Sequence, residues 1–237
     1  MAIGLALLFG IRIPINFNAP YKAKNISDFW RRWHMTLGRF MRDYLYIPLG
    51  GNQRGMCITL RNLFVVAFLS GIWHGAGFGF IIWGILHGIA MCIHRVYSWF
   101  LESRNLRKSA FLQSRIYHIF CWILTFNFIN VSWIFFRSEN ISGALNLLKS
   151  MFGIVWVELP QKWWRMGELL ATIDGKDKLV IFTIVAFVVV LCCKNSIEML
   201  KSFNASIWNA AIVGFFLFLS ILLLFSVPYT EFIYFNF

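Results

Sequence analysis

The chain has 237 residues, of which 59% are hydrophobic and only 14% are charged, and its mean hydropathy is +0.67. Soluble domains carry about 25% charged residues, so this composition excludes an ordinary soluble protein and is typical of membrane proteins. The net charge of +12 is high enough for a nucleic-acid-binding protein. In so apolar a chain we attribute it instead to loops that face the cytoplasm and anionic lipid. The expected partner is therefore the lipid bilayer, and no nucleic acid.

The first element that we expect is a basic amphipathic helix over residues 29–46. On a helical wheel its aromatic and aliphatic side chains share one face and its arginines the other, which is typical of a helix lying in a membrane interface. His34 falls within the apolar face, so we expect it to point towards whatever the helix covers. Ser27 or Asp28 is the expected N-cap. Asp28 and Asp43 stand among arginines and are expected to be ion-paired.

Residues 62–93 are almost uncharged and are interrupted by the sequence GAGFG at positions 75–79. They predict either one long tilted helix or a hairpin that turns at the glycines. The preceding flank, residues 12–61, carries nine Lys/Arg against two acids, and the following flank, residues 94–115, carries five against one. Both flanks are therefore expected on the cytoplasmic side, which favours a hairpin. Arms shorter than the about 20 residues of a full span favour a re-entrant hairpin.

Three further hydrophobic stretches, residues 116–136, 179–193 and 207–227, predict transmembrane spans. The loop after the first of them is nearly charge-balanced and is expected outside, with an amphipathic segment, ISGALNLLKSMF, and three interfacial tryptophans, Trp156, Trp163 and Trp164. The aromatic tail, PYTEFIYFNF, is expected outside as well. Since we find no internal repeat or linker, residues 1–237 are expected to form one all-α, multi-pass membrane domain.

His74, in GIWHGAG, is the strongest candidate for chemistry. An ionisable side chain deep in a membrane segment is costly and points to function. A buried imidazole that stays neutral can take the proton of a hydroxyl that attacks an acyl carbonyl. The alternative is a structural histidine bonded to a neighbouring helix, and spacing alone leaves both open. A histidine placed like His34 is more often a packed residue, but it becomes a second candidate if the amphipathic helix covers the hairpin.

Other catalytic signatures are missing from the sequence. There is no GxSxG motif, no phosphate-binding loop and no zinc-ligand spacing, so no metal site is expected. His87 either orients the site or simply packs, and His94 and His118 are expected at the membrane boundary. The arginine face is either solvated or holds the phosphates of a coenzyme A donor.

Two blocks of the sequence, INFNAPYKAKNISDFWRRWHMTLGRFMRDYLYIPLGGNQRG and SGIWHGAGFGFIIWGILHG, closely resemble the membrane-bound O-acyltransferase (MBOAT) family, in its alginate O-acetylation branch. The closing EFIYFNF adds to the resemblance. It implies a multi-helix bundle around a tunnel that joins a cytoplasmic acyl donor to an extracytoplasmic acceptor. It also implies His74 as the catalytic histidine and His34 as the second one. Substrate binding is assigned to the following residues of the two blocks: Arg31, Arg32, Arg39 and Trp73.

The resemblance further implies an acetyltransferase of the bacterial inner membrane. It would use acetyl-CoA as donor, bind no cofactor, and modify hydroxyls of an exported polysaccharide such as alginate or peptidoglycan, together with an extracytoplasmic acetyltransferase. Family members are much longer, so we expect the chain to match their C-terminal half, with a separate polypeptide supplying the N-terminal helices. Residues 1–11 would then end a helix that begins upstream. Two alternatives stay open: a non-catalytic membrane fragment that docks partner proteins, and a channel or transporter with a histidine relay, which the lack of carboxylates in the spans disfavours.

Overall fold

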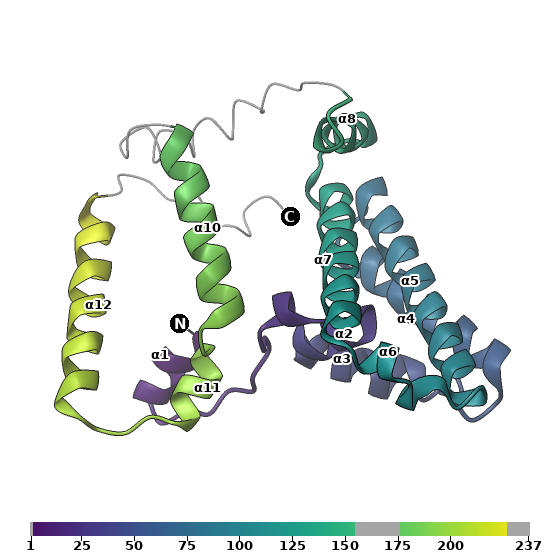
Figure 1. Ribbon diagram of the computed structural model, residues 1–237, viewed down its shortest axis with the longest axis horizontal. Coiled ribbons are helices and arrows are strands. Elements are labelled where there is room, and N and C mark those ends of the chain that lie inside the picture. Colours follow the sequence, from purple (N-terminus) through teal and green to yellow (C-terminus); the bar gives the residue numbers. More distant parts are fainter. Residues whose placement is uncertain (1, 155–175, 227–237) are drawn as a thin grey trace. The chain divides into compact units, whose positions relative to one another are not determined.

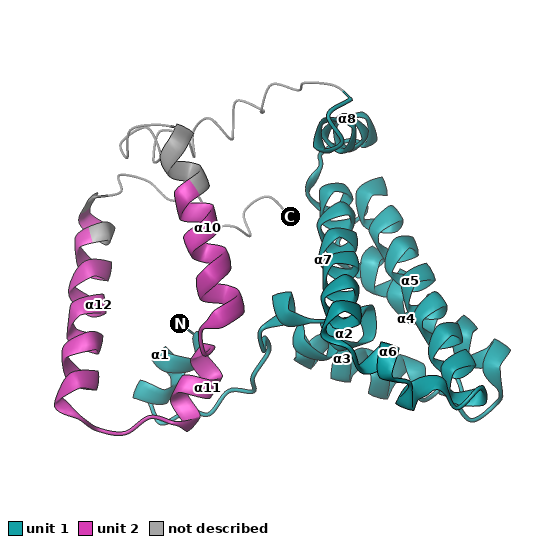
Figure 2. Cartoon of the chain, in the orientation of Figure 1, with its two compact units in different colours: residues 1–157 teal, residues 158–237 magenta. Residues whose placement is uncertain are grey.

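The structure is a computed structural model that describes residues 2–154 and 176–226 (Figure 1). Every element within these ranges is a helix, which confirms the all-α class. The chain divides into two compact units, residues 1–157 and 158–237 (Figure 2), and each is described by itself. The expectation of a single membrane domain stays a prediction.

The centre of unit 1 is a hairpin of two helices, α4 (Met56–His74) and α5 (Phe78–Ser103), which share the most extensive packing of any two elements. The chain turns between them at residues 75–77, within the glycine-rich stretch where the hairpin is predicted to turn. Gly71 faces Gly84 across the pair, and a Cβ atom at Gly71 would lie 2.9 Å from the Cα of Gly84. Small residues at such a crossing let two helix backbones touch.

The arms of this hairpin extend beyond the expected boundaries at residues 62 and 93. α4 has 19 residues and α5 has 26, and both are long and apolar enough to cross a membrane. α4 begins before Asn62 because Arg61 is accommodated there, its guanidinium donating hydrogen bonds to the carbonyl oxygen of Leu49 and to Oδ1 of Asn62. The sequence favoured a re-entrant hairpin over two full spans only because its arms were expected to be short. Since both arms have the length of a full span, that argument no longer holds.

The amphipathic stretch is not one continuous helix, which corrects the prediction for residues 29–46. It forms α2 (Ile26–Arg32), α3 (Met35–Met41) and a π-helical turn, η2 (Arg42–Tyr46). His34 separates α2 from α3 with left-handed backbone angles, φ +45° and ψ +52°. A left-handed residue cannot continue a right-handed helix. The helical wheel placed His34 on one smooth apolar face because it assumed a helix without this break.

Asn16, in the loop before α2, accepts hydrogen bonds from the backbone that follows this break. The backbone N–H of Met35 donates to the carbonyl oxygen of Asn16, and the backbone N–H of Thr36 donates to Oδ1 of Asn16, at 2.9 Å and 3.0 Å. These groups therefore bond to the preceding loop instead of to α2. The N-cap of α2 is also corrected: Oδ1 of Asn25 accepts from the backbone N–H of Asp28 at 2.7 Å, so the cap lies upstream of Ser27.

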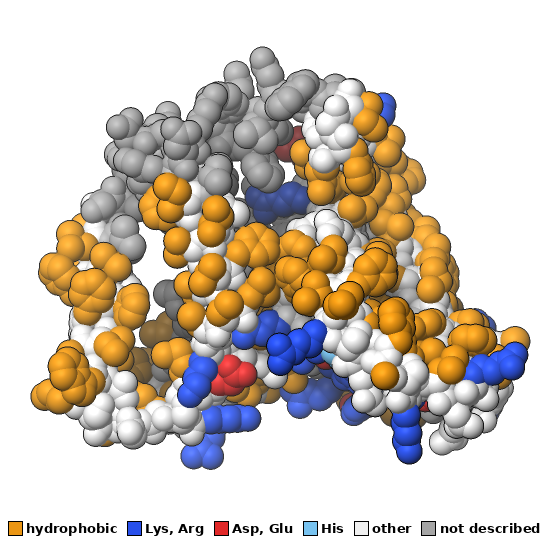
Figure 3. All heavy atoms as spheres, viewed as in Figure 1, with side chains coloured by type: hydrophobic (Ala, Val, Ile, Leu, Met, Phe, Trp, Pro, Cys, Tyr) orange, Lys and Arg blue, Asp and Glu red, His pale blue; other side chains and the backbone are white. Residues whose placement is uncertain are grey.

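α2 packs against the hairpin and against α7 (Arg115–Arg137), the third helix long enough to cross a membrane. Phe29 is only 2% exposed and forms a core with three other buried residues, Ala23, Ile26 and Ile129. α7 confirms the helix expected over residues 116–136. It exposes large apolar side chains on its outer face: Ile116, Ile119, Phe120, Ile123 and Leu124. Hydrophobic side chains cover much of α5 and α7 in Figure 3, as a lipid-facing surface requires.

The remaining described elements are short or lie in unit 2. Unit 1 also contains α1 (Ala2–Leu8), η1 (Pro20–Lys22), η3 (Leu106–Lys108), α6 (Ala110–Gln113) and α8 (Ile141–Met151), and unit 2 contains α10 (Lys176–Cys192), α11 (Ser196–Lys201) and α12 (Ile207–Ser226). α8 is the amphipathic segment expected there. α10 and α12 lie where spans are expected, and their crossing of a membrane stays a prediction. The three interfacial tryptophans and the aromatic tail lie outside the described residues.

Candidate active site

The structure brings His34, Trp73 and His74 together. The Trp73 ring centroid lies 6.3 Å from that of His34 and 4.9 Å from that of His74. Both imidazoles thus lie against the same indole ring. His34 comes from the break between α2 and α3, and His74 is the last residue of α4. Segments 40 residues apart in the sequence thus meet at one place because α2 packs against α5 and η2 packs against α4.

Aromatic rings surround His74 on its protein side. Its ring centroid lies 4.9 Å from that of Phe136 on α7 and 5.5 Å from that of Trp83 on α5, both in edge-to-face arrangements. Phe80 completes this enclosure at 6.4 Å. Such walls exclude water from one side of the imidazole while its other side stays accessible, since the residue is half-buried.

His34 carries a buried nitrogen that is available for chemistry. Its Nδ1 is shielded from solvent and has no hydrogen-bond partner within the part of the chain that the structure describes. Burial lowers the pKa of His34 below 6.5, and the backbone of the same residue partly opposes this effect. The imidazole is therefore neutral near pH 7, and a neutral imidazole can accept a proton.

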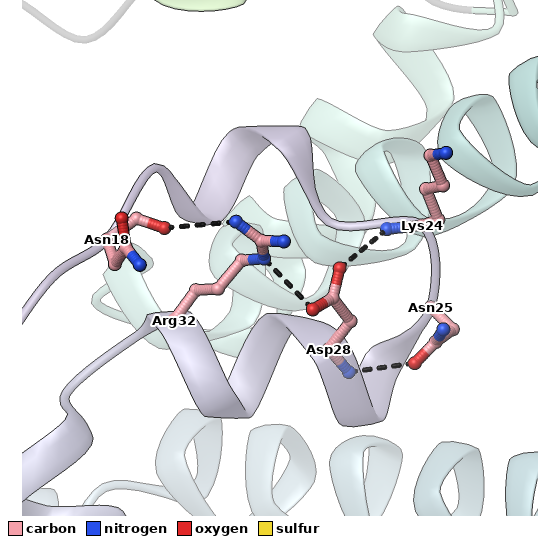
Figure 4. A network of polar contacts seen from close by, with 5 residues as sticks. All are labelled: Asn18, Lys24, Asn25, Asp28 and Arg32. Atoms are coloured by element: carbon pink, nitrogen blue, oxygen red, sulfur yellow. Dashed lines mark hydrogen bonds and ion pairs between the residues drawn. The ribbon is translucent and has the colours of Figure 1, made fainter. Parts of the chain in front are cut away.

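The predicted substrate-binding arginines do not act as one face. Arg32 is held within its own segment: its Nε donates to Asp28 Oδ1 at 2.9 Å and its guanidinium also donates to the carbonyl oxygen of Asn18 (Figure 4). This pair and the Asp43–Arg42 pair, at 2.8 Å, confirm that both aspartates are ion-paired. Arg39 is exposed on α3.

Arg31 instead lines a cavity of about 680 Å³, together with His94, Arg95 and Arg107. Nε of Arg95 is buried and has no hydrogen-bond partner among the described residues, whereas Arg107 forms an ion pair with Glu102 at 2.6 Å. The other polar lining residues include Asn25, Ser27, Tyr46, Asn52, Tyr97, Ser98 and Tyr117. A cavity so rich in donors suits an anionic, phosphate-bearing group. The sequence predicted substrate binding for Arg31 but did not reveal this cavity, because its other cations come from the second half of α5 and from η3.

The sequence leaves open whether His87 orients the site or only packs in the core. It is completely buried, and both of its ring nitrogens are hydrogen-bonded, one to Trp30 and one to Ser132. It touches neither solvent nor the accessible side of His74. Among the described residues we find no group of three or more histidine, cysteine, aspartate or glutamate side chains that could hold a metal ion.

Comparison with known proteins identifies the family of this chain. Residues 1–137, which include the whole two-histidine site, match the membrane-bound O-acyltransferase family. The chain belongs to the membrane-bound O-acyltransferase family. It is 42% identical to the peptidoglycan O-acetyltransferase of Helicobacter pylori over 248 aligned positions, which cover 100% of this chain and 45% of that protein.

Two other groups of MBOAT relatives are similar over shorter stretches. The probable alginate O-acetylase AlgI of Pseudomonas aeruginosa is 40% identical over 71% of this chain and 29% of its own length. The teichoic acid D-alanyltransferase of Bacillus subtilis is 32% identical over 54% of this chain and 33% of its own. The chain thus spans less than half the length of the curated relatives it matches.

Proposed function

We propose that this chain is the histidine-bearing part of an MBOAT enzyme that transfers an acetyl group from a thioester donor to hydroxyls of an exported polysaccharide. The observation that carries the proposal is the meeting of His34, Trp73 and His74 under an aromatic wall. The names of the relatives, which describe acetyl transfer to peptidoglycan and to alginate, support this class of acceptor.

In the proposed reaction His74 is the general base. It takes the proton from an acceptor hydroxyl as the oxygen attacks the acetyl carbonyl carbon, so that a C–O bond forms. The C–S bond of the donor then breaks, and the thiolate leaves with the proton that His74 carries. His34, across the Trp73 indole, is the second proton-handling group. Trp73, which is 61% exposed, offers its indole face to the acyl group or the sugar.

Acetyl-CoA is the proposed donor, and its phosphates would lie in the cavity lined by Arg31, Arg95 and Arg107. Guanidinium groups bind phosphate through paired hydrogen bonds. His94 in this cavity and Trp83, which contacts His74, stand eleven residues apart on α5, a rise of about 16 Å. An extended thioester arm would link the two places. Arg32 and Arg39 are more remote and stay weaker candidates for substrate binding.

The protein would act in the bacterial inner membrane with further polypeptides. An extracytoplasmic acetyltransferase is the proposed protein partner, and the helices present in the longer relatives would complete the enclosure of the site. A non-catalytic fragment is the second candidate, and the share of the Helicobacter relative that the chain covers, 45%, is the observation that favours it.

The test measures O-acetylation of peptidoglycan and of other exported polysaccharide in cells that carry the chain with its neighbouring genes. Three versions are compared: wild type, His74→Ala, and His118→Ala as a matched histidine control outside the site. Acetylation in wild type and in His118→Ala that disappears in His74→Ala supports the enzyme. Equal acetylation in all three would contradict the role of His74, and none in any, despite membrane expression, would favour the fragment.

A further inference from the structure

His87 lies in the middle of α5 and is 0% exposed, yet the proposed reaction does not use it. It is enclosed by four aromatic side chains, Phe29, Trp30, Trp83 and Phe128, with ring centroids between 4.4 and 6.3 Å away. A buried ionisable side chain among apolar rings is costly unless its polar atoms are satisfied. Its hydrogen bonds therefore show what holds it there.

The partners of His87 assign a single neutral tautomer. An indole N–H can only donate, and Trp30 Nε1 donates to His87 Nδ1 at 3.2 Å, so Nδ1 carries no proton. The ring proton must then be on Nε2, which donates to Ser132 Oγ at 3.0 Å. Ser132 Oγ in turn donates to the carbonyl oxygen of Ile129 at 2.8 Å. The chain of donors runs in one direction, from α2 through α5 to α7.

Two neighbours of His87, the hydrogen-bonded Trp30 and the packed Trp83, each lead to one histidine of the candidate site. The ring of Trp83 lies 4.4 Å from His87 and 5.5 Å from His74. Trp30 is hydrogen-bonded to His87 and stands in the last turn of α2, directly before the break that carries His34. The two indoles also contact each other at 5.7 Å. His87 is thus one ring away from His74 and about one helical turn away from His34.

We propose that His87 is a positioning residue that fixes His34 and His74 relative to each other. It forms a clamp in which its ring, anchored to Ser132 of α7, holds Trp30 of α2 by a hydrogen bond and packs against Trp83 of α5. The proposal adds to the function proposed above and rests on it only for the meaning of the two histidines. Its physical content, the placement of two imidazoles by a third, does not depend on acetyl transfer. Hydrogen-bond direction gives it a specific signature, because only a side chain that both accepts and donates can replace the imidazole.

The experiment compares His87→Gln with His87→Leu in the full chain, purified in detergent. A glutamine amide can accept from Trp30 and donate to Ser132, whereas leucine fills space but does neither. Both variants are treated with diethyl pyrocarbonate, which modifies neutral imidazoles. Peptide mass spectrometry then gives a separate rate of modification for each remaining histidine. His118, at the start of α7, is the internal control for the intact fold.

We expect His87→Leu to raise the modification rates of His34 and His74 by about fivefold, the factor that corresponds to one ordinary hydrogen bond, with His118 unchanged. His87→Gln is expected to restore rates close to those of wild type. Unchanged rates at His34 and His74 in His87→Leu would overturn the proposal, as would a glutamine variant that behaves like leucine.

If His87→Leu also raises the modification rate of His118, the leucine disturbs the fold itself. The clamp is then tested with Trp30→Phe instead. This change removes the indole N–H together with the five-membered ring that carries it, and keeps a phenyl ring in place. A rise at His34 and His74 with constant His118 supports the clamp, and no rise overturns it. The rates require no acetyl donor or acceptor, so failure of the proposed reaction and failure of the clamp are told apart. In an active complex, the same clamp predicts that His87→Leu lowers kcat, leaves the donor KM unchanged, and is rescued by His87→Gln.

Discussion

His34 combines a left-handed backbone conformation with a partly buried imidazole, and the two can be separated by substitution. Asparagine tolerates left-handed angles, whereas a β-branched residue does not. We expect His34→Asn to fold like wild type and to lose acetyl transfer, because only the imidazole is gone. His34→Val should lose activity and also about 1–3 kcal/mol of stability through backbone strain. Thermal unfolding in detergent measures the difference, and equal stability of the two variants would argue against the strained break.

The pH dependence of stability follows from the same residue. Burial lowers the pKa of His34 in the folded chain below its ordinary value of 6.5. Below pH 6.5 the unfolded chain therefore binds a proton that the folded chain does not, so the stability contributed by neutral His34 is present above pH 6.5 and is lost as the pH falls. Unfolding measured at about pH 7.5 and about pH 5.5 should show a smaller loss in His34→Asn than in wild type. An equal loss in both would contradict the assignment.

Single residues differ in how far the sequence reveals them. The sequence names His74 as a candidate because an ionisable side chain in an apolar run is costly, and it names His34 as a second candidate through the family resemblance. The clamp at His87 cannot be predicted in this way, since its partners Trp30 and Ser132 lie 57 and 45 residues away. The cationic cavity is hidden for the same reason: its arginines belong to different elements.

At the level of elements, the crossing of α4 and α5 depends on Gly71. A Cβ atom there would lie 2.5 Å from the carbonyl oxygen of Phe80 and 2.9 Å from the Cα of Gly84, both backbone atoms. Gly71→Ala should therefore force the arms apart and cost about 1–3 kcal/mol. Gly214→Ala in α12 is the matched control, because open space surrounds that glycine. Thermal unfolding of both variants checks the prediction, which an unchanged Gly71→Ala would refute.

Hydrophobic runs and glycines were enough to predict α7 and the turn of the hairpin. They were not enough for the length of its arms, because Arg61 is compatible with a helix once Leu49 accepts its hydrogen bond. The break at His34 is also a tertiary effect, since Asn16 takes over the hydrogen bonds that would continue α2. Local patterns thus predict where helices lie, and contacts with distant loops decide where they stop.

The whole of unit 1 has an orientation that can be measured. If α4, α5 and α7 all cross the membrane, Cys57 at the start of α4 and residue 138 just after α7 lie on opposite sides. The positive flanks predict that Cys57 lies on the cytoplasmic side. In a variant without the other cysteines, an impermeant maleimide should label Cys57 only after the membrane is opened. The matched variant with Ser138→Cys as its single cysteine should be labelled in intact spheroplasts. Labelling of both from outside would contradict the three-span arrangement.

The glycine contact between α4 and α5 has a consequence for permeability. A Cβ atom at Gly84 would lie within 3.2 Å of backbone atoms of α4, and one at Gly88 would overlap the ring of Phe64. The two arms therefore form a closed seam that admits neither a lipid tail nor a file of water molecules. In the proposed reaction, a proton or an acetyl group on its way to His74 would therefore travel along the outside of this seam, on the side where α2 and η2 pack. The closed contact between α4 and α5 would thus block the passage of ions, while a large polar acceptor approaches His74 from outside this contact.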